Sequence, residues 1–348
     1  MFNVDSIVRQ NIKKLQAYSS ARSEFKGEAS VYLDANENSF GSPLLQKYNR
    51  YPDPLQHSLK EKISEIKGVP PQNIFVGNGS DEAIDLLLRI FCEPKHDNIL
   101  ICPPTYGMYQ VSAEINDVAC LKVTLLPSFD LDVERILETV TETTKLLFIC
   151  SPNNPTGNSF NQEDVELLIQ KFNGIVVIDE AYINYSKQKS AIRFLTEYEN
   201  VVVLQTFSKA WGLAGLRLGM AFAPQVIIDY LNKVKPPYNI NQNSQQLAMD
   251  AIENIDWVNA HIHQTVAERN LMYEELKQLT CIEKVFATDA NFILIQVKNA
   301  DTMYAALAQK GIIVRNRSSV ELCNNCLRIT VGTTQENRLL LKTLKEIA

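Results

Sequence analysis

The sequence predicts an α/β fold with a mainly parallel sheet, followed by a second and smaller domain. From about residue 54 onward, short apolar runs alternate with helical segments, an order that favours a parallel sheet. The runs are apolar almost throughout rather than strictly alternating, which is typical of strands covered on both faces. With 348 residues, of which 45% are hydrophobic, the chain is too long for one small domain.

The individual elements follow from the apolar runs and from the residues that interrupt them. A helix is expected over residues 80–92, directly after the first run. Pro236-Pro237 ends the alternating pattern, because proline lacks an amide hydrogen and breaks regular elements. The expected strands of the sheet are residues 74–77, 99–102, 145–150, 175–178 and 201–204.

The two ends of the chain are expected to build an N-terminal arm and the smaller domain. Residues 5–17 have the spacing of one amphipathic helix, and residues 18–53 are polar and rich in turn residues. We therefore divide the chain into residues 1–53 (helix and arm, joining the smaller domain), 54–237 (large domain) and 238–348 (small domain). Within the small domain we expect helices near 241–254 and 256–280, strands at 291–296 and 327–330, and a closing helix.

Bulk composition narrows the class of protein. A net charge of −6 without basic runs argues against nucleic acid as the main partner. No apolar stretch is long enough to span a membrane, and the start of the chain lacks the apolar core of a signal peptide. The seven cysteines are odd in number and scattered, and the pair Cys323 and Cys326 lacks further ligands for zinc. We therefore expect a cytoplasmic enzyme for small molecules, without a metal.

Lys209 is the first candidate catalytic residue. It follows the apolar run 201–204, and burial or nearby cations would lower its pKa and make the amine nucleophilic. An ordinary exposed loop lysine is the alternative. The hydroxyls of Thr206 and Ser208, together with Arg217, favour the functional interpretation, because this combination suits an anionic phosphate.

A second motif places an acid at a strand end. The run 175–178 is followed by Asp179, and Tyr182 comes three residues after it. An aspartate at this position can simply cap the next turn. Alternatively, Asp179 pairs with a protonated pyridine nitrogen, which is the usual partnership of lysine and acid in pyridoxal-5′-phosphate (PLP) enzymes.

Three further motifs surround these two. Asn154 lies in the turn-rich segment 151–157, where it either shapes the turn or hydrogen-bonds a ring oxygen. The small residues 77–81 enter a helix, and free amide groups at a helix start can bind phosphate or need only a cap. Tyr106, after two prolines, either stacks on an aromatic ligand or fills the core.

Taken together, the order and spacing of these motifs resemble the fold-type I PLP enzymes of the aspartate aminotransferase superfamily, and within it the histidinol-phosphate aminotransferase family. The resemblance covers nearly the whole chain, with SPNNPTG at 151–157, DEAY at 179–182 and SK…AGLRLG at 208–219 as its most specific parts. It implies a large domain with a mainly parallel sheet of the seven-stranded type between helices, and a smaller α+β C-terminal domain.

The resemblance also implies a role for each motif. Lys209 would carry the cofactor covalently and move the proton at the substrate Cα, while Asp179 would hold the protonated ring nitrogen. Tyr182 and Asn154 would hydrogen-bond the phenolic oxygen, and Tyr106 would stack on the ring. The implied phosphate contacts come from Gly79, Ser80, Asp81, Thr206, Ser208 and Arg217.

The arm and the C-terminal domain would complete the site. Tyr51 would reach the cofactor phosphate of a partner subunit, so the resemblance implies a homodimer. Asn316-Arg317 departs from the family pattern, and the extra cation could change substrate preference. The residues implied at the substrate end are Tyr18, Asn36, Tyr51, Asn154, Arg315 and Arg328.

The expected activity is transamination between histidinol phosphate and 2-oxoglutarate, in histidine biosynthesis. Three alternatives stay open at this point: an aromatic amino acid aminotransferase, a threonine-phosphate decarboxylase, and a non-catalytic binding protein with the same fold. Retention of Lys209, Asp179 and Tyr182 argues against the last, because only catalysis needs all three.

Overall fold

A computed structural model describes residues 2–18, 29–45 and 47–347 of the chain. A seven-stranded sheet forms the centre of the larger part, with the strand order β1-β7-β6-β5-β4-β2-β3. Neighbouring strands among β2 to β6 pair in parallel, whereas β7 is antiparallel to both β6 and β1. The prediction of a mainly parallel sheet is therefore confirmed. The strands are β1 (Ile74–Asn78), β2 (Asn98–Ile101), β3 (Ala119–Lys122), β4 (Thr144–Cys150), β5 (Ile175–Asp179), β6 (Val201–Thr206) and β7 (Leu218–Phe222).

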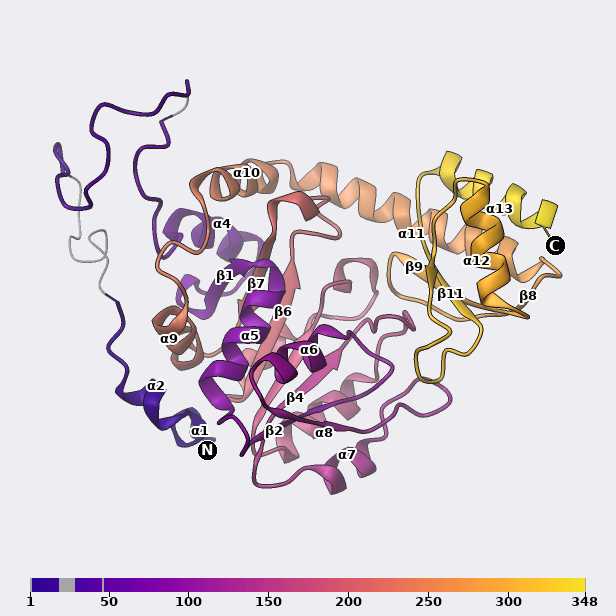
Figure 1. The fold of residues 1–348 in the computed structure, drawn as a ribbon, viewed down its shortest axis with the longest axis horizontal. Helices are drawn as coiled ribbons and strands as arrows, with labels where there is room; N and C mark the ends of the chain where they lie inside the picture. Colours follow the sequence, from indigo (N-terminus) through magenta and orange to yellow (C-terminus); the bar gives the residue numbers. More distant parts are fainter. Residues whose placement is uncertain (1, 19–28, 46, 348) are drawn as a thin grey trace.

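Helices cover both faces of this sheet, as Figure 1 shows. In β5, Val176 and Ile178 face one hydrophobic core while Ile175 and Val177 face the other. A strand buried on both faces must be apolar throughout, which explains the unbroken runs in the sequence. The helices are α4 (His57–Lys67), α5 (Gly79–Phe91), α6 (Met108–Ile115), α7 (Val133–Thr139), α8 (Gln162–Lys171) and α9 (Gln225–Val234), with 3₁₀ turns η1 (Pro71–Asn73), η2 (Ile183–Tyr185), η3 (Ala191–Thr196) and η4 (Ala214–Leu216).

The smaller part contains an antiparallel sheet in the order β10-β11-β9-β8. It has a hydrophobic core of its own, built around residues such as Ile293, Leu327 and Leu344. The long helix α11 runs from the large part to this small part (Figure 1). The elements are α10 (Gln242–Glu253), α11 (Ile255–Lys277), β8 (Ile282–Val285), β9 (Phe292–Val297), α12 (Ala300–Gln309), β10 (Arg315–Asn316), β11 (Cys326–Thr330) and α13 (Thr334–Ile347).

The N-terminal segment differs from the single helix predicted over 5–17. The structure has two short helices, α1 (Val4–Ile7) and α2 (Gln10–Lys14). The prediction is wrong because Val8 is extended between them (φ −71°, ψ 137°) and the amide of Arg9 donates to Ile90 O instead of continuing a helix. Both helices pack on the core beside α5.

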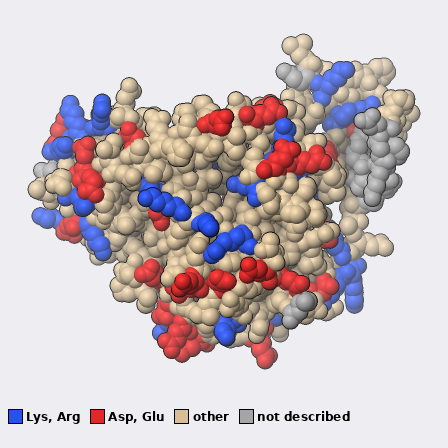
Figure 2. Space-filling view, turned by 180° about the vertical axis from the view of Figure 1, so that it is seen from behind, with Lys and Arg blue, Asp and Glu red and all other residues tan. Residues whose placement is uncertain are grey.

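The helices after Pro236-Pro237 also contact the large part. Helix α10 packs on α4, and Ile240, Ala248, Ile252 and Val258 belong to the core on one face of the seven-stranded sheet. The domain limits given above therefore stay predictions. Every helix in the described part of the chain is too short or too polar to cross a membrane. On the face seen in Figure 2, Lys and Arg lie interspersed with Asp and Glu.

Candidate active site

A cavity lies at the carboxyl ends of β4, β5 and β6, beside the start of α5. This is where ligands bind in open α/β sheets, because the connections diverge at that edge. The cavity brings together every residue expected to bind the cofactor except Tyr51. Its lining is Gly79, Ser80, Asp81, Tyr106, Cys150, Asn154, Asp179, Ala181, Tyr182, Thr206, Ser208, Lys209 and Arg217.

Asp179 ends β5 and is the buried acid of the cavity, with only 3% of its surface exposed. The hydroxyl of Tyr109 donates to its Oδ2 at 2.7 Å, and the amide of Ala181 donates to its Oδ1 at 3.1 Å. Burial raises the pKa of Asp179, and the two hydrogen bonds only partly oppose it. Among the described residues, no cation forms an ion pair with this carboxylate. Its position therefore suits a cationic group of a bound ligand.

Lys209 lines the same cavity, just beyond β6. Its Nζ lies 5.6 Å from the centre of the Tyr182 ring, and no described residue hydrogen-bonds it or pairs with it as an acid. Burial lowers the pKa of Lys209, and the nearby Arg328 and Arg217 lower it further, whereas Asp179 raises it. A lowered pKa leaves more of the amine unprotonated and able to act as a nucleophile or base.

The start of α5 and the residues after β6 form the polar end of the cavity. Gly79 has a φ of +71°, which a residue with a side chain rarely adopts, and its amide donates to Arg217 O at 2.8 Å. The Arg217 guanidinium lies 3.5 Å from the Asp81 carboxylate, and the amide of Ser208 donates to Thr206 Oγ1 at 3.0 Å. Helix starts and arginine both favour anions, so this end can hold a phosphate.

Strand β7, which was not predicted, is needed to shape this end. It lies antiparallel between β6 and β1, and its Gly219 faces the first turn of α5. A Cβ at Gly219 would collide with the backbone N of Ser80. Glycine therefore allows the helix start to lie directly over the sheet edge.

Arg328 reaches the cavity from the small sheet. It donates a short hydrogen bond from Nη1 to Asn154 Oδ1, and its guanidinium lies 5.1 Å from the centre of the Phe292 ring. Arg315 is its direct partner across the β10–β11 pair. Glu321 is an acid near Arg328 in the sequence that could have paired with it as a purely structural partner, but it accepts a hydrogen bond from Thr124 at 2.6 Å.

Three expected site residues from the arm lie outside this cavity, and Arg315 and Arg328 of the small sheet are also not part of its lining. Tyr51 stacks on Tyr238, with ring centres 4.4 Å apart and planes at 14°, and it lines a separate hollow together with Asn36. Tyr18 is 75% exposed. All three belong to the arm, which extends away from the body of the molecule at the left of Figure 1.

Sequence reasoning missed buried side chains whose hydrogen bonds hold the residues of the cavity wall in place. Tyr109 fixes Asp179, and Asn153, which is 0% exposed, donates to Pro104 O and Thr156 Oγ1. A second tyrosine three residues after Tyr106 was the available signal, but an aromatic residue at that spacing is equally typical of a core. Among the described residues, no three or more His, Cys, Asp or Glu side chains group as metal ligands.

Comparison with known proteins identifies the family. Residues 32–344 match the family model for aminotransferase class I and II. The histidinol-phosphate aminotransferase of Cytophaga hutchinsonii is 50% identical over 99% of both chains, and that of Bacteroides thetaiotaomicron is likewise 50% identical over 99% of both.

Solved structures agree on the fold. The histidinol-phosphate aminotransferase of Sinorhizobium meliloti, solved in complex with pyridoxal-5′-phosphate, superposes with a TM-score of 0.80 at 22% identity, covering 90% of this chain and 89% of that one. The Clostridium acetobutylicum histidinol-phosphate aminotransferase gives 0.78 at 24% identity, covering 86% and 91%. The predicted fold and family are confirmed, and the chain belongs to the class I and II aminotransferases, among the histidinol-phosphate aminotransferases.

Proposed function

We propose that the chain is a cytoplasmic enzyme of histidine biosynthesis that interconverts histidinol phosphate and 2-oxoglutarate with imidazole-acetol phosphate and glutamate. The observation that carries this proposal is the full-length likeness, at 50% identity, to histidinol-phosphate aminotransferases. The cavity supports it, because its lining combines a buried acid, a lysine of lowered pKa and Arg217 beside a helix start, and Arg328 hydrogen-bonds Asn154 in its wall.

The residues of the cavity fit PLP as the cofactor. Asp179 is a buried carboxylate that lacks a cationic partner in the described structure, and a protonated ring nitrogen would supply one. The start of α5 and Arg217 would hold the cofactor phosphate at the opposite end. When bound, PLP acts as an electron sink that stabilises negative charge at the substrate Cα.

Lys209 is proposed to hold the cofactor and to move the proton. Its Nζ lies 5.6 Å from the centre of the Tyr182 ring, and burial together with the charges of Arg328 and Arg217 lowers its pKa. An amine of lowered pKa can take the proton from the substrate Cα and return it at a neighbouring carbon. Tyr182 and Asn154 would orient the ring through its phenolic oxygen. Asp179, held by Tyr109, would keep the ring nitrogen protonated.

Arg315 and Arg328 are proposed to receive the anionic end of each substrate. The reaction must seat a phosphate and a carboxylate in turn, and a planar guanidinium can accept either as a bidentate partner. Arg328 is anchored by Asn154 and by the face of Phe292, so its fork is already oriented toward the cavity. Tyr18 and Asn36 would complete this end from the arm.

A half-reaction screen tests the proposed function. Single amino donors are added to the PLP form, and the change in its visible absorption band is followed. Histidinol phosphate and glutamate should both convert the band, and the keto products should be detectable. A preference for phenylalanine or tyrosine over histidinol phosphate would favour an aromatic aminotransferase. Release of CO₂ from threonine phosphate would favour the decarboxylase, and no band change with any donor a non-catalytic protein.

We further propose that the enzyme is a homodimer whose arm completes the partner's site. Large apolar side chains of the arm are exposed in the single chain, among them Leu33 (83%), Phe40 (103%) and Leu45 (102%). Exposed apolar groups at this density typically mark an interaction surface. Tyr51 lies on the same arm and outside its own cavity, as a residue acting on a partner would.

Hybrid dimers test this arrangement. Tyr51→Phe protein is mixed with Lys209→Ala protein under conditions that exchange subunits. In a hybrid, one site has both substitutions and the other has neither, so activity should recover toward that of one intact site per dimer. Verified hybrids without recovered activity would place Tyr51 in its own subunit's site or outside any site.

A further inference from the structure

Arg317 is a third arginine at the substrate end, where the sequence predicts an influence on substrate preference without naming the anion it binds. It directly follows β10, and its amide donates to Cys326 O at 2.9 Å, which extends the β10–β11 pairing by one step. Residues two apart in a strand share a face, so Arg317 lies on the same face of the sheet as Arg315. Arg328 is the cross-strand partner of Arg315. Asn316 between them turns the other way and donates to Asp301.

The three arginines are not neutralised by the chain itself. Within residues 2–18, 29–45 and 47–347, no carboxylate forms an ion pair with any of them. The Nε of Arg317 is buried and has no hydrogen-bond partner there. Burial lowers the pKa of Arg317, and the charges of Arg328 and Arg315 lower it further. Clustered like charges are costly when they are partly buried, unless an anion joins them.

The number of arginine charges indicates which substrate anion binds to them. A carboxylate of glutamate carries one negative charge, and two guanidinium groups already exceed it. A phosphate monoester carries close to two negative charges above its second pKa of about 6. Burial raises the pKa of Tyr182 in the wall of the cavity, and the charges of Arg328 and, less strongly, Arg317 oppose this rise, so Arg317 lies near the cavity.

We propose that Arg317 is a specificity-determining residue that binds the second negative charge of a phosphate-bearing substrate and contributes little to binding glutamate. This inference rests on the proposed function and names the residue that separates its two substrates. Arg315 and Arg328 bind both the carboxylate and the phosphate, whereas Arg317 contributes to binding the phosphate alone.

The test compares both half-reactions in wild type and Arg317→Gln. We expect kcat/KM for histidinol phosphate to fall about 10- to 100-fold, the usual range for losing a hydrogen bond to a charged group. The loss should appear mainly in KM, and kcat/KM for glutamate should change less than about threefold. Arg317→Lys should recover part of the loss. Arg135→Gln, on the exposed side of α7, is the matched control and should change neither reaction.

A second readout does not depend on turnover. Inorganic phosphate, added to the holoenzyme so that the cofactor's own phosphate site is filled, should raise the thermal midpoint of wild type and of Arg135→Gln more than that of Arg317→Gln. Equal losses for histidinol phosphate and glutamate, or an unchanged phosphate effect in Arg317→Gln, would overturn the inference. If wild type fails to react with histidinol phosphate, the proposed function fails, and the phosphate measurement still decides on Arg317.

Discussion

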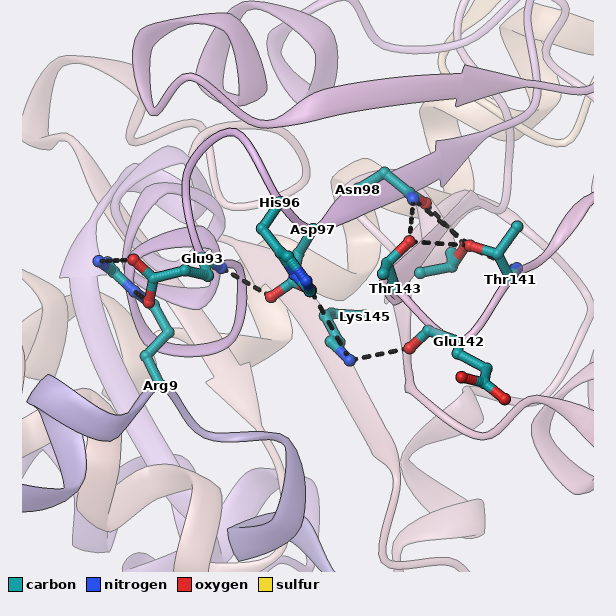
Figure 3. Close-up of polar contacts among 10 residues, drawn as sticks. Arg9, Glu93, His96, Asp97, Asn98, Thr141, Glu142, Thr143 and Lys145 are labelled. Carbon is teal, nitrogen blue, oxygen red and sulfur yellow. Dashed lines mark hydrogen bonds and ion pairs between the residues drawn. The ribbon is translucent and has the colours of Figure 1, made fainter.

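The two ends of the large sheet differ in how their charged side chains are paired. At the carboxyl ends of β5 and β6, Asp179 and Lys209 lack ion-pair partners among the described residues. At the amino ends of β2 and β4, Asp97 accepts from the amide of Glu93 at 2.8 Å and lies 3.8 Å from Lys145 Nζ. Figure 3 shows this second group as a continuous network that reaches Arg9 of the N-terminal segment.

The difference cannot come from burial, because Asp97 is 6% exposed and Asp179 3%. The difference lies in the partners of the two carboxylates: Asp97 has Lys145 Nζ within 3.8 Å, whereas no cation pairs with Asp179 among the described residues. A buried charge that is paired within the chain stabilises the fold or is neutral, whereas one left unpaired costs stability until a ligand arrives. The amino end therefore holds the fold together, and the carboxyl end is prepared for ligands. Substitutions at the two ends should separate stability from activity.

The largest expected effect is that of Lys209→Ala on activity. Losing both the covalent anchor and the proton carrier should lower turnover by about 10⁴-fold, the upper range for one acid–base group. Stability of the cofactor-free chain should not fall, because the substitution removes a desolvated cation near two arginines. Product formation and urea unfolding measure the two quantities.

Chemical labelling checks the assignment separately. Borohydride reduction of the holoenzyme, followed by peptide mapping, should place the pyridoxyl group on Lys209. A label on another lysine would end this interpretation of the cavity.

Arg328→Ala should have the next largest effect, again at the carboxyl end. Truncating one partner of a buried charge pair usually costs about 2–5 kcal/mol, which is the expected loss in kcat/KM for histidinol phosphate. Histidinol, which lacks the phosphate, should be barely affected. If both substrates lose equally, Arg328 does not bind the phosphate and instead shapes the cavity through Asn154.

Asp97→Ala should show the reverse pattern at the amino end. It leaves the amide of Glu93 without its acceptor and removes the carboxylate 3.8 Å from Lys145 Nζ, and an unsatisfied polar group costs about 1–3 kcal/mol of unfolding free energy. Turnover measured well below the thermal midpoint should be unchanged. Lys342→Ala removes an exposed ion pair, at 3.8 Å from Glu346, and should cost at most about 0.5 kcal/mol. Equal losses in both variants would mean that the network adds nothing.

The sequence was sufficient for the sheet and for most of the cavity, for a physical reason. Strands buried on both faces are apolar throughout, and turn residues mark their ends, so β4, β5 and β6 were visible. Edge strand β3 is partly exposed and too short to show a pattern, and β10 has only two residues.

The contacts between distant residues were beyond sequence reasoning. Tyr109 and Asp179 are 70 residues apart, and nothing local in either segment indicates that they meet. The break between α1 and α2 at Val8 likewise depends on a distant residue, because the amide of Arg9 donates to Ile90 O. In both cases tertiary packing decides the outcome over local propensity.

The smallest effect that we expect from a site residue is a pH dependence of the stability of the cofactor-free chain, caused by Asp179. Burial raises the pKa of Asp179 in the folded state above that of the unfolded chain. The folded state then keeps a proton that the unfolded state loses, so the contribution to stability is fully present below about pH 4 and is lost as the pH rises through the folded pKa. Asp179→Asn cannot ionise and should therefore unfold at higher urea than wild type at pH 8, but not at pH 4.

Bound cofactor should reverse this gain. With PLP bound, the ring nitrogen would pair with the Asp179 carboxylate and favour its charged form, so wild type should become the more stable of the two at pH 8. If Asp179→Asn destabilises the cofactor-free chain at both pH values, the carboxylate is already satisfied by Tyr109 and Ala181. The contrast between the two ends of the sheet would then not extend to this residue.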